Sequence, residues 1–302
     1  MPGPAPLKLS VLVGTYNRLP QLRVCLDSLV GKIACPHEIV VVDAGSTDGT
    51  IEFLRANRAI VPVLDGARLG QARSLNRAIR PLTSTNVCWV SDDNEILPGM
   101  LDTGVGILDA RPDIGMVGLK VKDVDGTHAH APYIGGIWET GILTCNQGLF
   151  RRDVFARLGG FDEEYPNYGI DADLTARFLL EKCAVALTKR VAIHHHREHG
   201  KFPGTMAVAE RGGKMDAARG IYARKFSGRL EVGGFLGRVR ASVARRLTGI
   251  ARALSNRRRD LDSRNGYTPR DYYNVSLGRY IARNDLVEND GRDYYLVQKM
   301  AH

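Results

Sequence analysis

The sequence predicts an α/β fold in which a mostly parallel sheet is flanked by helices. Over the first 120 residues, short runs rich in β-branched residues alternate with segments whose apolar residues recur at helical spacing. This alternation is typical of parallel strands joined by crossover helices. The chain has 302 residues, of which 44% are hydrophobic and 25% charged, so it can bury a sizeable core.

Five strands are expected in this part of the chain, at residues 9–13, 38–43, 61–64, 87–90 and 116–119. Between the first two, four leucines at helical spacing should pack a helix against the sheet. The second strand leads into a turn and then a helix, which Ser46 or Thr47 could cap. Ligands of such sheets bind at the carboxyl ends of the strands, so we expect residues 14–18, 43–47 and 91–95 to converge on one edge.

The next part of the chain is less regular. Residues 123–141 are rich in glycine and histidine and are typical of a loop, and a strand-like stretch follows at residues 141–150. Two helices are then expected, near residues 152–158 and 171–181, before a strand that ends in three consecutive histidines. Beyond residue 200 the composition shifts, so we divide the chain into an α/β domain of residues 1–200 and a basic helical region of residues 201–302.

The net charge of +9 is concentrated in that second region. Residues 221–260 hold eleven Lys and Arg against two acids, so the rest of the chain is close to neutral. Within residues 235–254 the apolar side chains share one arc of a helical wheel and several arginines lie opposite. Such a helix could rest on anionic lipid through residues 235–259, or its apolar face could pack on the α/β domain. Nucleic acid is not an expected partner, because aromatic stacking residues are nearly absent among the arginines.

Location and redox state follow from simple counts. No apolar run reaches the eighteen residues needed to span a bilayer, and the first seven residues are too short and proline-rich for a secretory signal. We therefore expect a cytoplasmic protein, with a peripheral position at the inner face of the membrane left open. The five cysteines form no CxxC pair, which favours reduced packing residues over disulfides or a zinc site.

Two adjacent carboxylates, Asp92 and Asp93, follow the apolar strand predicted at residues 87–90. Carboxylate oxygens at a strand end suit Mg²⁺ or Mn²⁺, which also bind diphosphate. Taken alone, the SDDN sequence is more typical of a turn. The neighbouring motifs shift the interpretation toward a metal.

Five motifs, in this order and at this spacing, resemble the family-2 glycosyltransferases of GT-A fold. They are LSVLVGTYNR at residues 9–18, EIVVVDAGSTDGT at 38–50, SDDNEILPG at 91–99, GGFDE at 159–163, and DADL at 171–174 with Arg177 following. The resemblance covers about residues 8–200. It implies a Rossmann-like GT-A catalytic domain with a nucleotide-binding half at about residues 8–120, an acceptor half at about 121–200, and a helical C-terminal appendage.

The resemblance implies a nucleoside-diphosphate sugar as donor. Thr15, Tyr16, Asn17 and Arg18 would line the nucleotide pocket, and Asp92 would bind the ribose. Asp43 would accept a hydrogen bond from the base, most naturally uracil or thymine. Arg73 would contact the base or a phosphate, although a solvated helix arginine fits the same position equally well.

The resemblance also implies a metal ligand and a base. Asp93 would ligate Mn²⁺ or Mg²⁺, and a histidine at the end of the last strand would complete the site. His194 and His196 should point the same way along that strand and His195 the opposite way, and we choose His194 first and His196 second.

Asp171 lies at the position of the catalytic base, which would take the proton of the acceptor hydroxyl as that oxygen attacks the anomeric carbon with inversion. The residues alone also allow a structural interpretation. In it Asp171 is a helix N-terminal carboxylate stabilised by the helix dipole, and Asp173 and Arg177 form an i,i+4 pair on the surface.

Three positions depart from the family pattern, namely Ala44, Ser91 and Ile170. They motivate an alternative function, a non-catalytic GT-A protein that binds nucleotide or a partner without turnover. A nucleotidyltransferase is a second alternative, but residues 14–18 lack the glycine-rich phosphate loop of that class. For a transferase, the acceptor would be a glycan, a lipid-linked sugar or a small molecule.

Overall fold

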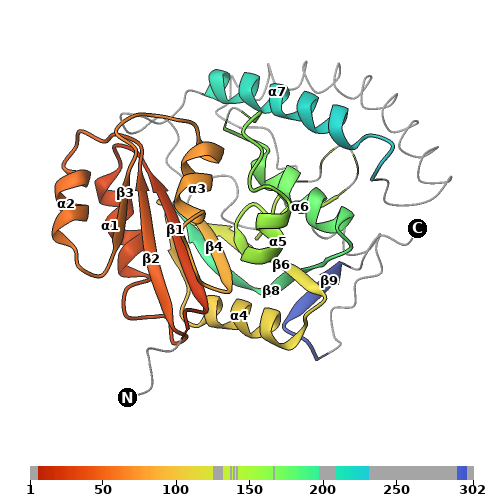
Figure 1. Cartoon of the computed structure of the whole chain (residues 1–302), viewed down its shortest axis with the longest axis horizontal. Coiled ribbons are helices and arrows are strands. Elements are labelled where there is room, and N and C mark those ends of the chain that lie inside the picture. Colours follow the sequence, from red (N-terminus) through yellow and green to blue (C-terminus); the bar gives the residue numbers. More distant parts are fainter. Residues whose placement is uncertain are drawn as a thin grey trace.

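The structure, a computed structural model, describes residues 6–124, 132–136, 138, 140, 142–165, 167–196, 208–230 and 291–297. Within these residues nine strands form one sheet, in the order β3-β2-β1-β4-β7-β6-β8-β5 with β9 beside β8 (Figure 1). The strands are β1 (Leu9–Thr15), β2 (His37–Asp43), β3 (Val61–Leu64), β4 (Asn86–Ser91), β5 (Asn94–Ile96), β6 (Ile114–Asp123), β7 (Gly148–Arg151), β8 (Ala184–His195) and β9 (Tyr294–Val297). All run in one direction except β5, β7 and β9, which confirms the predicted α/β fold with a mostly parallel sheet.

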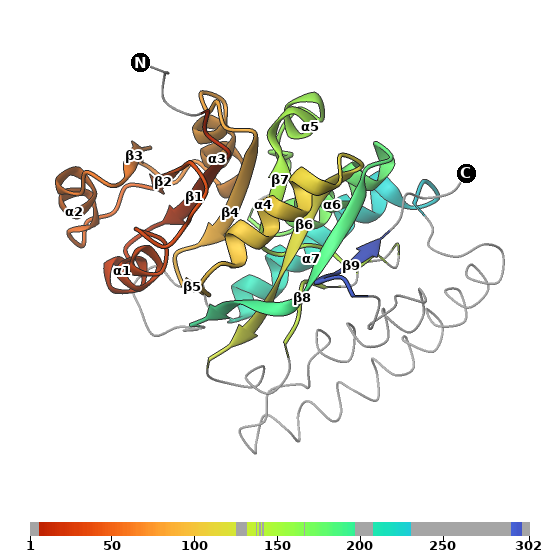
Figure 2. The same ribbon diagram turned by 90° about the horizontal axis from the view of Figure 1, so that it is seen from below.

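Helices cover both faces of this sheet. One face packs against α1 (Leu19–Asp27), α2 (Thr50–Ala56) and α4 (Met100–Ala110), and Figure 2 shows α4 lying across the sheet. The other face packs against α3 (Gln71–Ile79), α5 (Arg152–Arg157), α6 (Ile170–Leu180) and α7 (Val208–Phe226). Alternation along β1 divides its side chains between the two cores, with Val11 and Val13 in one and Leu12 in the other.

The spatial order of the strands places the functional loops. The chain builds β1, β2 and β3 outward in one direction and then returns to place β4 on the opposite side of β1. The carboxyl ends of β1 and β4 therefore lie side by side at the point where the strand order reverses. This is where open α/β sheets bind ligands.

Two local expectations were wrong. The helix after β2 begins at Thr50 with Gly49 as its N-cap, at φ 90°, so neither Ser46 nor Thr47 caps it. Asp48 accepts the hydrogen bonds of the Thr50 N–H and hydroxyl instead, at 3.2 and 2.6 Å. In addition β5 and β9 were not predicted, because β5 has three residues, too few to show alternation, and β9 lies in the C-terminal region that was expected to be helical.

The described parts of the C-terminal region join the α/β core. Ala218, Tyr222 and Phe226 of α7 are buried in the same core as α6, and Tyr295 of β9 is 6% exposed at the edge of β8. Tyr294 and Tyr295, for which the sequence suggested no role, thus form part of a strand.

The boundary at residue 200 stays a prediction, and the amphipathic helix expected at residues 235–254 lies outside the described residues. Within the described ranges, every helix is too short or too polar to cross a bilayer.

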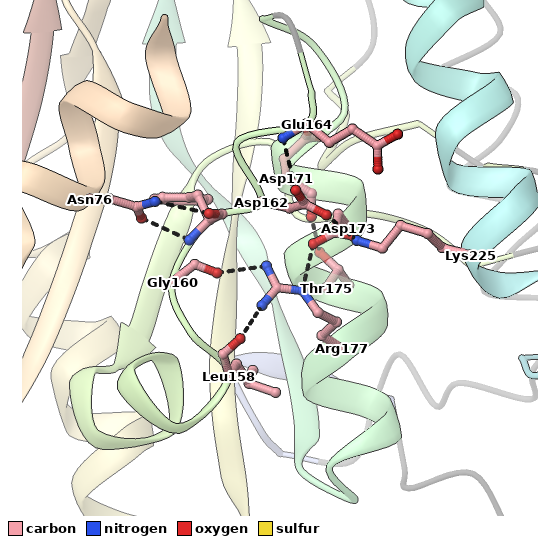
Figure 3. A network of polar contacts seen from close by, with 11 residues as sticks. Asn76, Leu158, Gly160, Asp162, Glu164, Asp171, Asp173, Thr175, Arg177 and Lys225 are labelled. Atoms are coloured by element: carbon pink, nitrogen blue, oxygen red, sulfur yellow. Dashed lines mark hydrogen bonds and ion pairs between the residues drawn. The ribbon is translucent and has the colours of Figure 1, made fainter. Parts of the chain in front are cut away.

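A buried network of charges holds the amino-terminal half of α6 (Figure 3). Asp173 accepts hydrogen bonds from Arg177 Nε at 2.5 Å and from Lys225 of α7. Arg177 also donates to the carbonyls of Leu158 and Gly160, at 2.9 and 2.7 Å. The Asp173 side chain is fully buried, so the expectation of a surface pair was wrong. The i,i+4 spacing is as predicted, but the pair joins α6 to its neighbours because α7 and the loop of residues 158–162 cover it.

Replacing Arg177 with methionine should destabilise the protein by about 3 kcal/mol, because it leaves Asp173 buried with Lys225 as its remaining cation. Urea unfolding at pH 7 measures this free energy. Arg157→Met is the matched control, since Arg157 forms an exposed i,i+4 pair with Asp153 on α5, and its effect should stay within about 0.5 kcal/mol. Equal losses in the two variants would contradict the assigned role of Arg177.

Candidate functional site

Arg18 bridges the two carboxylates that follow β4. Its Nη1 lies 2.8 Å from Asp92 Oδ1 and its Nη2 lies 2.9 Å from Asp93 Oδ2. The Thr15 hydroxyl, at the end of β1, donates to Asp92 Oδ2 at 2.8 Å. Three residues predicted from the sequence to share a site, Thr15, Arg18 and Asp92, are therefore in direct contact, and Asp93 lies beside them.

The two carboxylates differ in how strongly they hold a proton. Burial raises the pKa of Asp92, the Arg18 charge opposes this rise, and neighbouring Asp93 adds to it. Burial acts in the same direction on Asp93, but the hydrogen bond and charge of His195, together with Arg18, outweigh it and hold its pKa below the usual range. Asp93 is thus the member of the pair that stays ionised. Its Oδ1 is buried and has no hydrogen-bond partner among the described residues.

Strand β5 carries Asp93 to the end of β8. Its three residues pair antiparallel with β8, with Asn94 opposite His195, and the Asp93 carbonyl accepts the His196 N–H at 2.8 Å. In this register His195 Nε2 lies 3.3 Å from Asp93 Oδ2.

The predicted alternation of the three histidines is observed, and it places His195, rather than the chosen His194 or His196, beside Asp93. His194 and His196 both face Glu95, at 3.7 and 3.2 Å from its Oε2. His195, which the sequence analysis passed over, is the one beside Asp93. The spacing alone could not show which face of β8 turns toward the carboxylates, because that depends on the unpredicted pairing with β5.

Asp43, at the end of β2, is buried and held in one orientation. Its Oδ1 accepts the N–H groups of Gly45 and Ser46, both at 2.9 Å. Its Oδ2 is buried without a hydrogen-bond partner among the described residues. Gly45 is required in this turn, because its φ is +86° and a Cβ would lie 2.8 Å from the Gly66 carbonyl oxygen. One acceptor atom of Asp43 is therefore available in a rigid loop.

Asn17 ties this loop to the end of β1. It takes a left-handed conformation at φ 51°, its N–H donates to Ser46 Oγ at 2.8 Å, and its Oδ1 accepts the Thr47 N–H at 2.7 Å. These contacts use Ser46 and Thr47 to join two loops, which explains why neither is a helix cap.

Arginines of the β3–α3 segment surround the same edge. The Arg68 guanidinium lies 4.9 Å from the centre of the Tyr16 ring, and Arg77 pairs at 2.9 Å with Asp65, whose side chain is fully buried. Neither Arg68 nor Asp65 was predicted. Arg73 is exposed and lies 3.5 Å from Glu163, so its position in this structure is that of a helix arginine paired across a loop.

Asp171 lies in the first turn of α6, in the opposite half of the fold. The helix starts after Gly169 at φ +93°, where a Cβ would lie 2.8 Å from the Tyr165 ring. Burial raises the Asp171 pKa to about 6, while N–H groups of the first turn and the Thr144 hydroxyl, 3.4 Å from Oδ2, act to lower it. Asp171 is therefore a carboxylate able to exchange a proton near neutral pH.

The residues around Asp93 offer part of the ligand set that a divalent cation needs. Among the described residues, no group of three or more His, Cys, Asp and Glu side chains is arranged to hold a metal by itself. Asp93, with its unpartnered Oδ1, and His195 offer one carboxylate and one imidazole. Such a pair fits Mn²⁺ or Mg²⁺ when a diphosphate supplies the remaining oxygens. The site fits a shared cation and does not fit a closed protein cage.

Comparison with protein families agrees with the motif order. The family model described as glycosyl transferase family 2 matches residues 10–159, which confirms the resemblance drawn from the sequence. A curated relative, the N-acetylglucosaminyl-diphospho-decaprenol L-rhamnosyltransferase of Mycobacterium tuberculosis, is 27% identical over 67% of this chain and 80% of its own length. The O-antigen biosynthesis protein RfbC of Myxococcus xanthus is 26% identical over 67% of this chain, but this covers 18% of that protein.

Solved structures share the fold. S. aureus TarS 1-349 in complex with UDP-GlcNAc superposes with a TM-score of 0.55 and 21% identity, over 67% of this chain and 62% of that one. The mannosyltransferase PcManGT from Pyrobaculum calidifontis, in complex with GDP-Man and Mn²⁺, superposes with a TM-score of 0.52 and 21% identity. The match covers 92% of this chain and 90% of that one. These similarities show the GT-A fold.

Replacing Asp171 with asparagine should stabilise the folded protein at pH 8 and change it little at pH 4. The folded-state pKa of about 6 lies above the ordinary value of 3.8, so the wild type loses stability as pH rises through this interval. The expected gain at pH 8 is about 2 kcal/mol, since Asp171 keeps part of its surface in water. Urea unfolding at the two pH values checks this, and a destabilisation of equal size at both would contradict it.

Proposed function

Because the chain belongs to glycosyltransferase family 2 through residues 10–159, we propose that it transfers a sugar from a nucleoside diphosphate to an acceptor hydroxyl, with inversion and the assistance of a divalent cation. The observation that carries the proposal is the joining of β1, β4 and β8 at one point. There Thr15 and Arg18 contact Asp92, and Asp93 faces His195. The Asp93 Oδ1 atom has no hydrogen-bond partner among the described residues.

The donor nucleotide would bind across the carboxyl ends of β1, β2 and β4. Asp43 Oδ2 is the atom that would accept the N–H of the base, and it suits the single imide N–H of uracil or thymine, so UDP or dTDP is favoured. Thr15, Tyr16, Asn17 and Arg18 would line the pocket and Asp92 would bind the ribose. The predicted contact of Arg73 with base or phosphate would require this side chain to leave Glu163.

The cation would be held by Asp93 and His195, which replaces His194 and His196 in the proposal because those two side chains face Glu95. Mn²⁺ or Mg²⁺ in this position would offset the negative charge that develops on the departing diphosphate. The Mn²⁺ present with PcManGT supports a divalent ion in this fold.

Asp171 would act as the base. Its pKa of about 6 leaves it ionised at neutral pH and yet able to receive the proton of an acceptor hydroxyl. The Gly169 turn and Thr144 would set the direction of its carboxylate, and the negative charge of nearby Asp173 is paired with Arg177 and Lys225. Attack from the face opposite the leaving diphosphate would invert the anomeric centre.

A lipid-linked acceptor of envelope polysaccharide synthesis suits the chain best. This rests on the decaprenol-linked substrate named for the mycobacterial relative and on the O-antigen role named for RfbC. The basic segment of residues 235–259 would then contact anionic lipid at the inner face of the membrane.

The donor site is tested by calorimetric titration of the full chain with UDP, dTDP, GDP and ADP, with and without Mn²⁺. We expect one nucleotide to bind in a metal-dependent manner, with UDP or dTDP first, and Asp93→Ala to abolish the metal dependence. Asp153→Ala, which removes an exposed carboxylate of α5, is the control and should bind as the wild type does. Binding that ignores both Mn²⁺ and Asp93 would overturn the cation site, and binding without turnover would favour the non-catalytic alternative.

The role of Asp171 is tested by kinetics. Asp171→Asn should lower kcat by about 10²- to 10⁴-fold and leave the nucleotide dissociation constant unchanged. In the wild type, kcat/KM should rise with pH and level off above about pH 7, because Asp171 must be ionised to accept the proton. A flat profile between pH 5 and 8, or near-full activity of the variant, would count against a base at this position.

A further inference from the structure

His195 is held between two carboxylates, one on each ring nitrogen. Its Nε2 faces Asp93 Oδ2 at 3.3 Å, and its Nδ1 lies 2.9 Å from Asp123 Oδ1. Asp123, at the end of β6, is fully buried, and the hydroxyl of Tyr133 donates to the same Oδ1 at 3.0 Å. Neither Asp123 nor Tyr133 takes part in the donor site or the base described above.

The three side chains are fixed by strand pairing. Asp123 lies opposite His195 in the β6–β8 ladder. Tyr133 forms a bridge with Val121, with both backbone hydrogen bonds present at 2.6 and 2.8 Å, and its side chain is 2% exposed. The Tyr133 hydroxyl also lies 3.1 Å from His195 Nδ1. The orientation of the imidazole ring is thus set by backbone structure on two sides.

The chemistry of these groups selects the tautomer. An ionised carboxylate accepts hydrogen bonds and donates none, so the 2.9 Å contact with Asp123 places a proton on His195 Nδ1. The phenol hydroxyl can rotate its proton toward Asp123, so Oδ1 receives both donors. Nε2 is then the nitrogen that points toward Asp93, and a cation bound there would take the place of the proton that Nε2 shares with Asp93 in the metal-free protein.

We propose that Asp123 and Tyr133 are positioning residues that hold His195 with Nδ1 protonated and Nε2 directed to the cation side of Asp93. The inference rests on the proposed function, since it assigns the orienting partners of a residue proposed there as a cation ligand. Carboxylates that orient a ligand histidine in this manner typically contribute 10- to 100-fold to metal affinity.

The test measures Mn²⁺ affinity by electron paramagnetic resonance in the presence of UDP or dTDP. Asp123→Asn should weaken Mn²⁺ binding by about 10- to 100-fold, and Tyr133→Phe, which keeps the packed ring, by a smaller factor in the same direction. Thr188→Val is the matched control. It removes another buried hydrogen bond of β8, from the Lys120 N–H to Thr188 Oγ1 at 2.8 Å, away from His195, and should leave the affinity unchanged.

A second readout does not depend on metal or activity. Nitrogen-15 NMR of the metal-free wild type should show a proton on Nδ1 of His195 that exchanges slowly with water, and this protection should be lost in Asp123→Asn. An unprotonated Nδ1 in the wild type would overturn the proposal. So would a Thr188→Val variant that loses as much Mn²⁺ affinity as Asp123→Asn, because the effect would then be one of stability.

The two readouts separate this inference from the proposed function. If the wild type binds no Mn²⁺ with any of the four nucleoside diphosphates, the proposed cation role of Asp93 and His195 fails. The Nδ1 proton and its loss in Asp123→Asn then decide the positioning of His195 alone. If Mn²⁺ binds the wild type and Asp123→Asn equally well, the proposed function stands and the role of Asp123 and Tyr133 is overturned.

Discussion

The site depends on one interaction, the bridge that Arg18 makes to Asp92 and Asp93. Two neighbouring carboxylates at a buried strand end repel each other and lose hydration, so they need an opposing cation. The guanidinium supplies it with one nitrogen on each, at 2.8 and 2.9 Å. Arg18 comes from the end of β1, so this bridge also joins the two strands between which the sheet order reverses. The electrostatic requirement and the chain topology therefore meet in the same side chain.

A second constraint comes from β5. This strand has three residues, yet its pairing with β8 sets which histidine faces Asp93. A shift of one residue in that register would turn His195 away and bring His194 or His196 inward. The position of the imidazole is thus a property of backbone hydrogen bonding, which Asp123 and Tyr133 then refine from the β6 side.

Much of the fold could be predicted, because β1 to β4 and β6 are apolar runs rich in β-branched residues, and because apolar spacing and flanking turn residues indicated the helices α1, α5 and α6. The convergence of Thr15, Arg18 and Asp92 followed from the rule that ligands bind at carboxyl strand ends. What failed were features that depend on contacts between distant segments. Local sequence could not reveal the facing of His195, the burial of Asp173 by Lys225, or the strand formed by Tyr294 and Tyr295. Asp123 and Tyr133 lie in or beside a stretch typical of loops. Their contact with His195 could not be predicted, because it depends on the pairing of β6 with β8.

The balance of charge around Asp93 explains why a cation suits this edge of the sheet. Asp93 and Asp123 contribute two negative charges and Asp92, whose pKa burial raises, a partial one, while Arg18 contributes one fixed positive charge and the His195 ring would become neutral once a cation replaced its Nε2 proton. This leaves negative charge in surroundings from which water is largely excluded, and Asp93 Oδ1 has no donor of its own among the described residues. A divalent ion would neutralise the excess without displacing Arg18 from Asp92. A diphosphate alone would add to it, so we expect donor and cation to bind together rather than in sequence.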